Sequence, residues 1–134
     1  MLTTEGFLQQ LQDGYASLTR LSMCVIGQDG AAVTRAAECS EHEGRGGLPS
    51  AVEPAFWLGG FGDIKGPVFY DSSEGQKYII APIRQESRIA YYVCAGPVNE
   101  VNKESFLDSI RAMSEAAGSW LDARSCLERH ARLL

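Results

Sequence analysis

The C-terminal stretch, residues 102–134, constrains the fold most, because it contains no proline and carries one continuous helical pattern. Its apolar positions recur in alternating steps of four and three, which is the spacing of a heptad repeat. The repeat runs through positions 106, 110, 113, 117, 120, 124, 127, 131 and 134, and eight of these nine are apolar. With Asn102 as its cap, a helix of about 32 residues is roughly 48 Å long, at ~1.5 Å per residue. We expect its start to pack on the domain and its remainder on a partner helix, or else the whole helix to lie on its own core.

The rest of the chain is the size of a single domain. At 134 residues, two separate cores would each be small for stability. We therefore predict one domain at residues 1–118 and an extension of the last helix at residues 119–134. The sequence contains no apolar run long enough to cross a membrane, and its first residues lack the pattern of a secretory signal. These features predict a cytoplasmic domain without membrane contact.

Charge and histidine placement exclude several functions. A net charge of −5 disfavours nucleic-acid binding, which needs clustered Lys and Arg. His42 falls in a polar loop and His130 near the end of the helix, so neither is placed for catalysis. Cys39 and His42 have a metal-ligand spacing, but two ligands do not close a site. We predict no catalytic residue, no metal and no cofactor.

A helix and a β-hairpin are predicted before residue 39. Apolar residues at helical spacing predict a helix over residues 4–18, with a stripe of Phe7, Leu8, Leu11, Tyr15 and Leu18. Residues 21–26 and 31–38 flank Asp29-Gly30, a strong tight-turn signal. The Gly- and Glu-rich residues 39–54 predict a loop.

Three more strands are predicted after the loop, at residues 68–70, 77–84 and 89–96. In the second of these, Tyr78, Ile80 and Pro82 share one face, while Ile79, Ala81 and Ile83 share the other. The third strand also has two usable faces, so we expect both sides of the sheet to be covered.

Three of these segments resemble the GAF domain, a sensory module of bacterial signalling proteins. They are LSMCVIGQDG at residues 21–30, KYIIAPI at 77–83 and YYVCAG at 91–96. FWLGGFGDI at residues 56–64 also looks like sensory regions of bacterial histidine kinases. The resemblance implies an α/β (α+β) fold. A central antiparallel sheet of five or six strands would carry the N-terminal and long C-terminal helices on one face and a ligand pocket on the other. A PAS domain is the competing fold.

The candidate ligand site combines aromatic walls with a few polar tips, which suits a small ligand in a mostly apolar pocket. Its members are Trp57, Phe61, Tyr70, Tyr78, Arg84, Tyr92 and Cys94. Arg84 is the residue best suited to a carboxylate or phosphate, because its guanidinium can bind in a bidentate manner. The alternatives are that the set fills the core and that Arg84 is a solvated strand end.

The resemblance implies a regulatory domain that senses an unknown small molecule, in a sensor histidine kinase. The domain would relay its state through its C-terminal helix as a homodimer, without being an enzyme itself. GAF domains that bind cyclic nucleotides carry an Asn-Lys-Phe-Asp-Glu motif, which is missing here. Two alternatives remain open: a thiol-based redox enzyme or sensor using Cys94 or Cys39, and a dimerisation module without a ligand.

Overall fold

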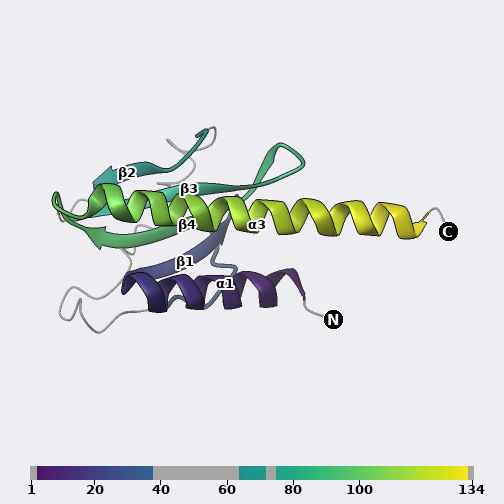
Figure 1. The fold of residues 1–134 in the computed structure, drawn as a ribbon, viewed down its shortest axis with the longest axis horizontal. Coiled ribbons are helices and arrows are strands. Elements are labelled where there is room, and N and C mark those ends of the chain that lie inside the picture. The colour runs from purple at the N-terminus through teal and green to yellow at the C-terminus, as the bar shows by residue number, and fades with distance from the viewer. Residues whose placement is uncertain (1–2, 38–63, 72–74, 133–134) are drawn as a thin grey trace.

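The computed structural model describes residues 3–37, 64–71 and 75–132. Its elements are α1 (Thr4–Thr19), β1 (Ser22–Gly27), β2 (Val68–Asp71), β3 (Lys77–Gln85), β4 (Arg88–Val98) and α3 (Lys103–Arg132). The strands form one sheet in the order β1-β4-β3-β2, and all neighbouring strands are antiparallel. The fold is therefore α+β, as predicted (Figure 1). Within the described residues the sheet has four strands, whereas the resemblance implied five or six.

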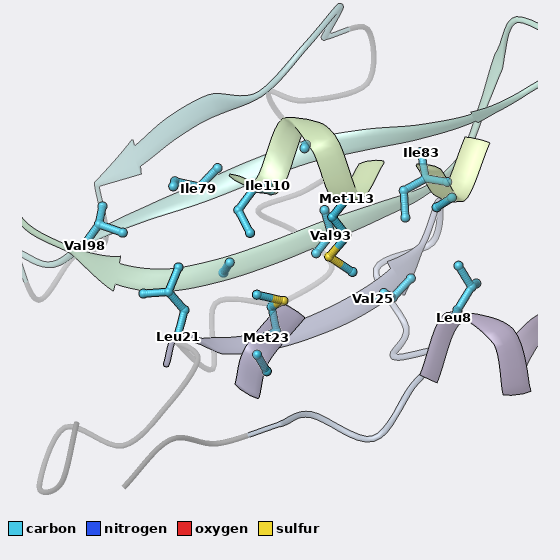
Figure 2. Close-up of a cluster of buried hydrophobic side chains, with 14 of the residues drawn as sticks. Leu8, Leu21, Met23, Val25, Ile79, Ile83, Val93, Val98, Ile110 and Met113 are labelled. Atoms are coloured by element: carbon cyan, nitrogen blue, oxygen red, sulfur yellow. The ribbon is translucent and has the colours of Figure 1, made fainter. Parts of the chain in front are cut away.

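Both helices pack on the same face of the sheet, where the larger core lies. Ile110 and Met113 of α3 are fully buried together with Ile79 and Val93 of the sheet, and Figure 2 shows these side chains gathered with Leu8 of α1. Each such side chain stabilises the fold by about 1.5–3 kcal/mol relative to an exposed one. The odd-numbered residues of β3 face the helices, which confirms the alternation predicted for that strand.

Helix α1 begins at an N-cap and ends at a left-handed residue. The hydroxyl of Thr3 accepts a hydrogen bond from the Gly6 amide at 3.0 Å. Arg20 is the C-cap of the helix, with a φ of 64°, and its backbone N–H donates a hydrogen bond to the Ala16 carbonyl. The prediction for Leu18 is wrong, since that side chain is 76% exposed. The buried stripe consists of Leu8, Gln12, Ala16 and Thr19.

Hydrogen bonds of two glutamine side chains explain why the buried stripe of α1 is rotated relative to the predicted one. Gln12 is fully buried, and its Nε2 donates to the Arg35 carbonyl at 2.7 Å. Its Oε1 accepts from the Val25 amide at 3.2 Å and from the Thr34 hydroxyl. The amide of Gln9 pairs with the Arg35 backbone, donating to its carbonyl at 3.1 Å and accepting from its N–H at 2.8 Å. The helix therefore turns its glutamines, and not Leu18, toward the backbone beside β1.

The predicted hairpin after residue 21 is only partly regular. Gly30 takes the left-handed conformation that its turn needs, at φ 84°. The returning chain then meets β1 at two isolated bridges, Met23 with Ala37 and Ile26 with Ala32. Between these bridges the Val25 carbonyl accepts from the Val33 N–H at 2.8 Å, while the side chains of Gln12 and Thr34 accept from the Val25 N–H.

Helix α3 begins at Lys103, directly after Asn102, which confirms the predicted start of the helix. The side-chain oxygen of Asn99 accepts from the backbone N–H groups of Val101 and Asn102, at 3.0 and 2.9 Å. The side chain of Asn102 accepts in return from the Asn99 N–H at 2.9 Å. The two asparagine side chains thus close the turn that leads into the helix. The Asn102 side chain bonds to Asn99 in that turn, and the helix begins at the next residue, Lys103.

The heptad positions of α3 divide between the domain's own core and solvent. Ile110, Met113 and Ala117 are fully buried against the sheet. Leu127 is 71% exposed, where α3 continues beyond the β3–β4 hairpin (Figure 1). The start of the helix therefore packs on its own domain, while the division at residues 118/119 stays a prediction. Neither α1 nor α3, within their described residues, has an apolar stretch long enough to cross a membrane.

Two intermediate heptad positions of α3 contact α1. The Trp120 ring stacks on Phe7 with centroids 4.0 Å apart and an interplanar angle of 6°. Arg124 lies over the Trp120 ring and donates to the Thr4 hydroxyl at 3.0 Å. These two positions are therefore occupied within the domain, so a partner helix would have to pack further along α3.

Candidate functional site

The face of the sheet opposite the helices carries a second buried cluster, which we call the tyrosine face. It consists of Cys24, Ile26, Tyr70, Tyr78, Ile80, Tyr92 and Cys94. Successive side chains of a strand point to opposite faces, so residues that alternate with the helix-facing core gather here. The structure thus brings together four members of the predicted site, from β2, β3 and β4. Trp57 and Phe61 lie outside the described residues.

The tyrosines present buried rings with polar ends. Tyr70 and Tyr78 are partners across β2 and β3, with ring centroids 6.5 Å apart and tilted by 32°. The Tyr78 hydroxyl donates to the side-chain oxygen of Gln76 at 2.8 Å. Tyr92, on β4, is also buried. Rings of this kind suit an aromatic or apolar ligand and equally suit a filled core.

Two cysteines lie side by side on this face. Cys24 of β1 and Cys94 of β4 are direct partners across the two strands. Burial, reinforced by the neighbouring Cys24, raises the pKa of the Cys94 thiol far above its ordinary value. Burial also raises the pKa of Cys24, although a hydrogen bond from Thr34 opposes the shift. Both sulfurs are therefore protonated thiols at neutral pH, and neither is an activated nucleophile.

Cys24 was not included in the predicted site, although the sequence carried a signal for it. It lies in the middle of the predicted strand 21–26, and Cys94 lies in the middle of 89–96. Only the antiparallel register places the two opposite each other. That register involves strands nearly seventy residues apart, and no local pattern specifies it.

Arg84 lies at the border of the tyrosine face and does not point a free guanidinium into it. Its Nη2 donates to the carbonyl of Ile64 at 2.7 Å, and its Nη1 makes a longer bond of 3.4 Å to the Ser87 carbonyl. The side chain of Ile64 packs against the tyrosine face. A register shift between Ile83 and Arg84 interrupts the strand at this point. The guanidinium thus bonds to the backbone carbonyls of Ile64 and Ser87, so fewer of its N–H groups are available to bind an anion.

Arg84 also lines a groove between the outer edge of β3 and α3. The groove has a volume of about 530 Å³, within the ~300–1,000 Å³ typical of small-molecule sites. Its lining is Lys65, Gly66, Pro67, Pro82, Arg84, Arg111, Ser114, Glu115, Gly118, Ser119 and Asp122. Arg111 pairs with Asp108, and Asp122 accepts from a backbone amide of the β3–β4 turn. Charges of both signs line the groove, so it selects no single class of ion.

The described residues contain no group of three or more His, Cys, Asp and Glu side chains that could hold a metal. His130 lies exposed on α3, while Cys39 and His42 lie outside the described residues. The tyrosine rings and thiols of the described residues are buried in one cluster, as in a filled core, and the groove beside Arg84 has a different lining.

The comparisons with known proteins support the fold. No protein-family model matches the sequence, and no curated protein matches it. Among solved structures, the chain is similar to a protein from Rhodococcus sp. RHA1 described as "a putative transcriptional regulator". That match has a TM-score of 0.64 and 17% sequence identity, and it covers 91% of this chain and 70% of the other. At this identity the similarity shows a shared fold alone.

Proposed function

We propose that the chain is a GAF-like regulatory domain of a bacterial signalling protein, in which a small ligand at the tyrosine face changes the position of α3. One observation carries this proposal: α3 is a single helix of 30 residues that packs on the core of the sheet from Ile110 to Leu121 and ends exposed. A helix of that kind carries a change at the sheet to whatever follows it. A sensor histidine kinase in the cytoplasm is the parent protein we favour, and the domain itself is not the enzyme.

The sheet provides the mechanical link in this proposal. Strands β3 and β4 carry tyrosine-face residues and helix-packing residues in alternation, as with Tyr92 and its neighbour Val93. A ligand that displaces one face of a strand therefore moves the side chains on which α3 rests. Such a ligand acts only by binding one arrangement of the strands more tightly than another.

The similar structure adds support at the level of the fold. The Rhodococcus protein is described as "a putative transcriptional regulator", which is in keeping with a regulatory role for a chain of this fold. The same proposal includes a sheet of five or six strands and a GAF fold in place of a PAS fold.

A ligand screen with matched tyrosine variants tests the proposal. Purified protein would be melted in the presence of a few hundred metabolites, as wild type, Tyr92→Phe and Tyr91→Phe. Tyr92 lies in the tyrosine face, whereas Tyr91, next to it on β4, packs against the helix-side core. We expect a metabolite that raises the melting temperature of wild type and Tyr91→Phe, with a smaller rise for Tyr92→Phe. Equal loss in both variants, or no stabilising metabolite, would contradict a ligand site here and favour a ligand-free dimerisation module.

A thiol-based redox sensor is the second candidate, and the pairing of Cys24 with Cys94 favours it. Met23 exchanges two backbone hydrogen bonds of 2.8 Å with Ala37, on the side of β1 away from β4. Because successive residues of a strand direct their backbone groups to opposite sides, Cys24 directs its N–H and carbonyl toward β4. Hydrogen-bonded partners of this kind have Cα atoms about 5.5 Å apart, inside the ~4.4–6.8 Å range of disulfides. Their Cβ atoms are also about 5.5 Å apart, beyond the ~3.5–4.5 Å of a disulfide, so the two strands have to move closer for the bond to form. Cys39, the other cysteine proposed for this chemistry, lies outside the described residues.

Oxidation by a peroxide would convert this pair into a disulfide in two balanced steps. One sulfur takes an oxygen atom from the peroxide and releases water, and the second thiol then displaces a second water as the S–S bond forms. The raised pKa values of both thiols make the reaction slow. Peptide mapping of a Cys39→Ser/Cys126→Ser variant after peroxide treatment should show a Cys24–Cys94 link. Only unmodified thiols, or oxygen addition without a link, would exclude this candidate.

A further inference from the structure

The turn between β3 and β4 has a backbone conformation that its residues do not favour. Glu86 and Ser87 are its two central residues, and both have left-handed φ angles, 53° and 70°. A two-residue hairpin turn of this kind normally takes Asn-Gly or Asp-Gly, because other side chains are strained there. The sequence therefore places Glu at a position where turn geometry alone would select Asn.

Contacts with α3 explain this choice. The Glu86 amide donates to the Asp122 carboxylate at 2.6 Å, and the Glu86 carboxylate forms an ion pair with Arg129. Next to them, Gln85 donates from its side-chain amide to the Ser125 hydroxyl at 2.5 Å. The three α3 residues are spaced by three and four, so they lie on one face of the helix.

The helix is also in close contact with the strand one turn before these residues. At Gly118, a Cβ atom would come within 3.0 Å of the Arg84 carbonyl oxygen. That distance is tighter than ordinary packing, so a side chain at this position would push the two backbones slightly apart. The register shift between Ile83 and Arg84 lies at the same level of β3.

We propose that the β3–β4 turn is a latch that fixes where α3 leaves the sheet. The latch consists of Gln85 and Glu86 on the turn and Asp122, Ser125 and Arg129 on the helix. The close backbone contact at Gly118 lies one turn before these helix residues, and beyond it the latch holds the helix against the hairpin. A change in the register of β3 at its irregular end shifts the turn, and the turn then shifts the helix from Asp122 to Arg129. The signalling meaning of this movement rests on the proposed function, whereas the latch itself is a property of the isolated domain.

The first test measures amide hydrogen exchange in α3 without any ligand, so its outcome does not depend on the sensory role. Asp122→Ala removes the acceptor for the Glu86 amide, Asp122→Asn keeps an oxygen there, and Asp108→Ala removes an α3 aspartate that bonds only to Arg111 among the described residues. We expect exchange over residues 119–129 to become about three- to tenfold faster in Asp122→Ala, the effect of losing one hydrogen bond. Asp122→Asn and Asp108→Ala should remain near wild type. Wild-type exchange in Asp122→Ala would overturn the proposal.

The second test separates a latch from ordinary turn stability. The double variant Glu86→Asn/Ser87→Gly supplies the residues that the turn geometry favours but removes the carboxylate that pairs with Arg129. The melting temperature should rise, because the turn is relaxed, while residues 126–131 exchange faster, because one latch contact is gone. The two readouts therefore move in opposite directions. If protection at the end of α3 rose together with the melting temperature, the turn would be strained for a reason unrelated to α3.

Discussion

At the scale of single residues, Gln12 shows how a polar side chain can determine the orientation of an amphipathic helix. Its amide is fully buried and bonds to the backbone of Arg35 and Val25, which lie on two separate segments. Buried polar groups are tolerated only when their hydrogen bonds are made, and here both ends of the amide are engaged. The helix stripe therefore centres on Gln12 and leaves Leu18 in solvent.

Replacement of Gln12 by alanine should be among the most destabilising changes in α1. The variant loses a buried amide and leaves backbone groups of Arg35 and Val25 with fewer partners, so we expect about 2–3 kcal/mol less stability. Urea denaturation measures the difference, with Gln10→Ala as the matched control because Gln10 is exposed on the same helix. If the two variants were equally stable, the amide network of Gln12 would contribute nothing to the fold.

At the scale of elements, the strands were predictable from sequence because alternation is a local property. Tyr78 and Ile80 were assigned to one face of β3 and Ile79 and Ala81 to the other, and both assignments are confirmed. The error in α1 arose where a polar side chain bonds to neighbouring backbone. Gln12 takes a buried place in a stripe that was predicted to be apolar, and Leu18 is left exposed.

The candidate site was predictable to the same extent, and for the same reason. Tyr70, Tyr78, Tyr92 and Cys94 share a face because of their parity within strands, which the sequence displays. The pairing of Cys94 with Cys24 and the bonds of Arg84 to Ile64 depend on tertiary register, which it does not display. Likewise, the heptad pattern of the sequence does not show that Trp120 and Arg124 contact α1.

At the scale of the whole molecule, the domain has two buried faces with α3 spanning the change from core to solvent. The tyrosine face and the two helices lie on opposite faces of the sheet. The β3–β4 turn, at one end of the sheet, is hydrogen-bonded to α3. On this account, a ligand acts on the sheet, and the exposed end of α3 reports the result to a second copy of the chain. The outermost described positions of the heptad repeat, Leu127 and Ala131, are exposed and so remain open to that partner.

The oligomeric state of the chain and of two leucine variants, measured by light scattering over a range of concentrations, tests this account most directly. Leu127→Ser changes an exposed leucine on the outer part of α3, and Leu18→Ser changes a similarly exposed leucine on α1, with exposures of 71% and 76%. We expect a wild-type dimer that Leu18→Ser leaves intact and that Leu127→Ser shifts toward monomer. A dimer that persists unchanged in Leu127→Ser, or a wild type that stays monomeric at every concentration, would contradict signalling through paired α3 helices.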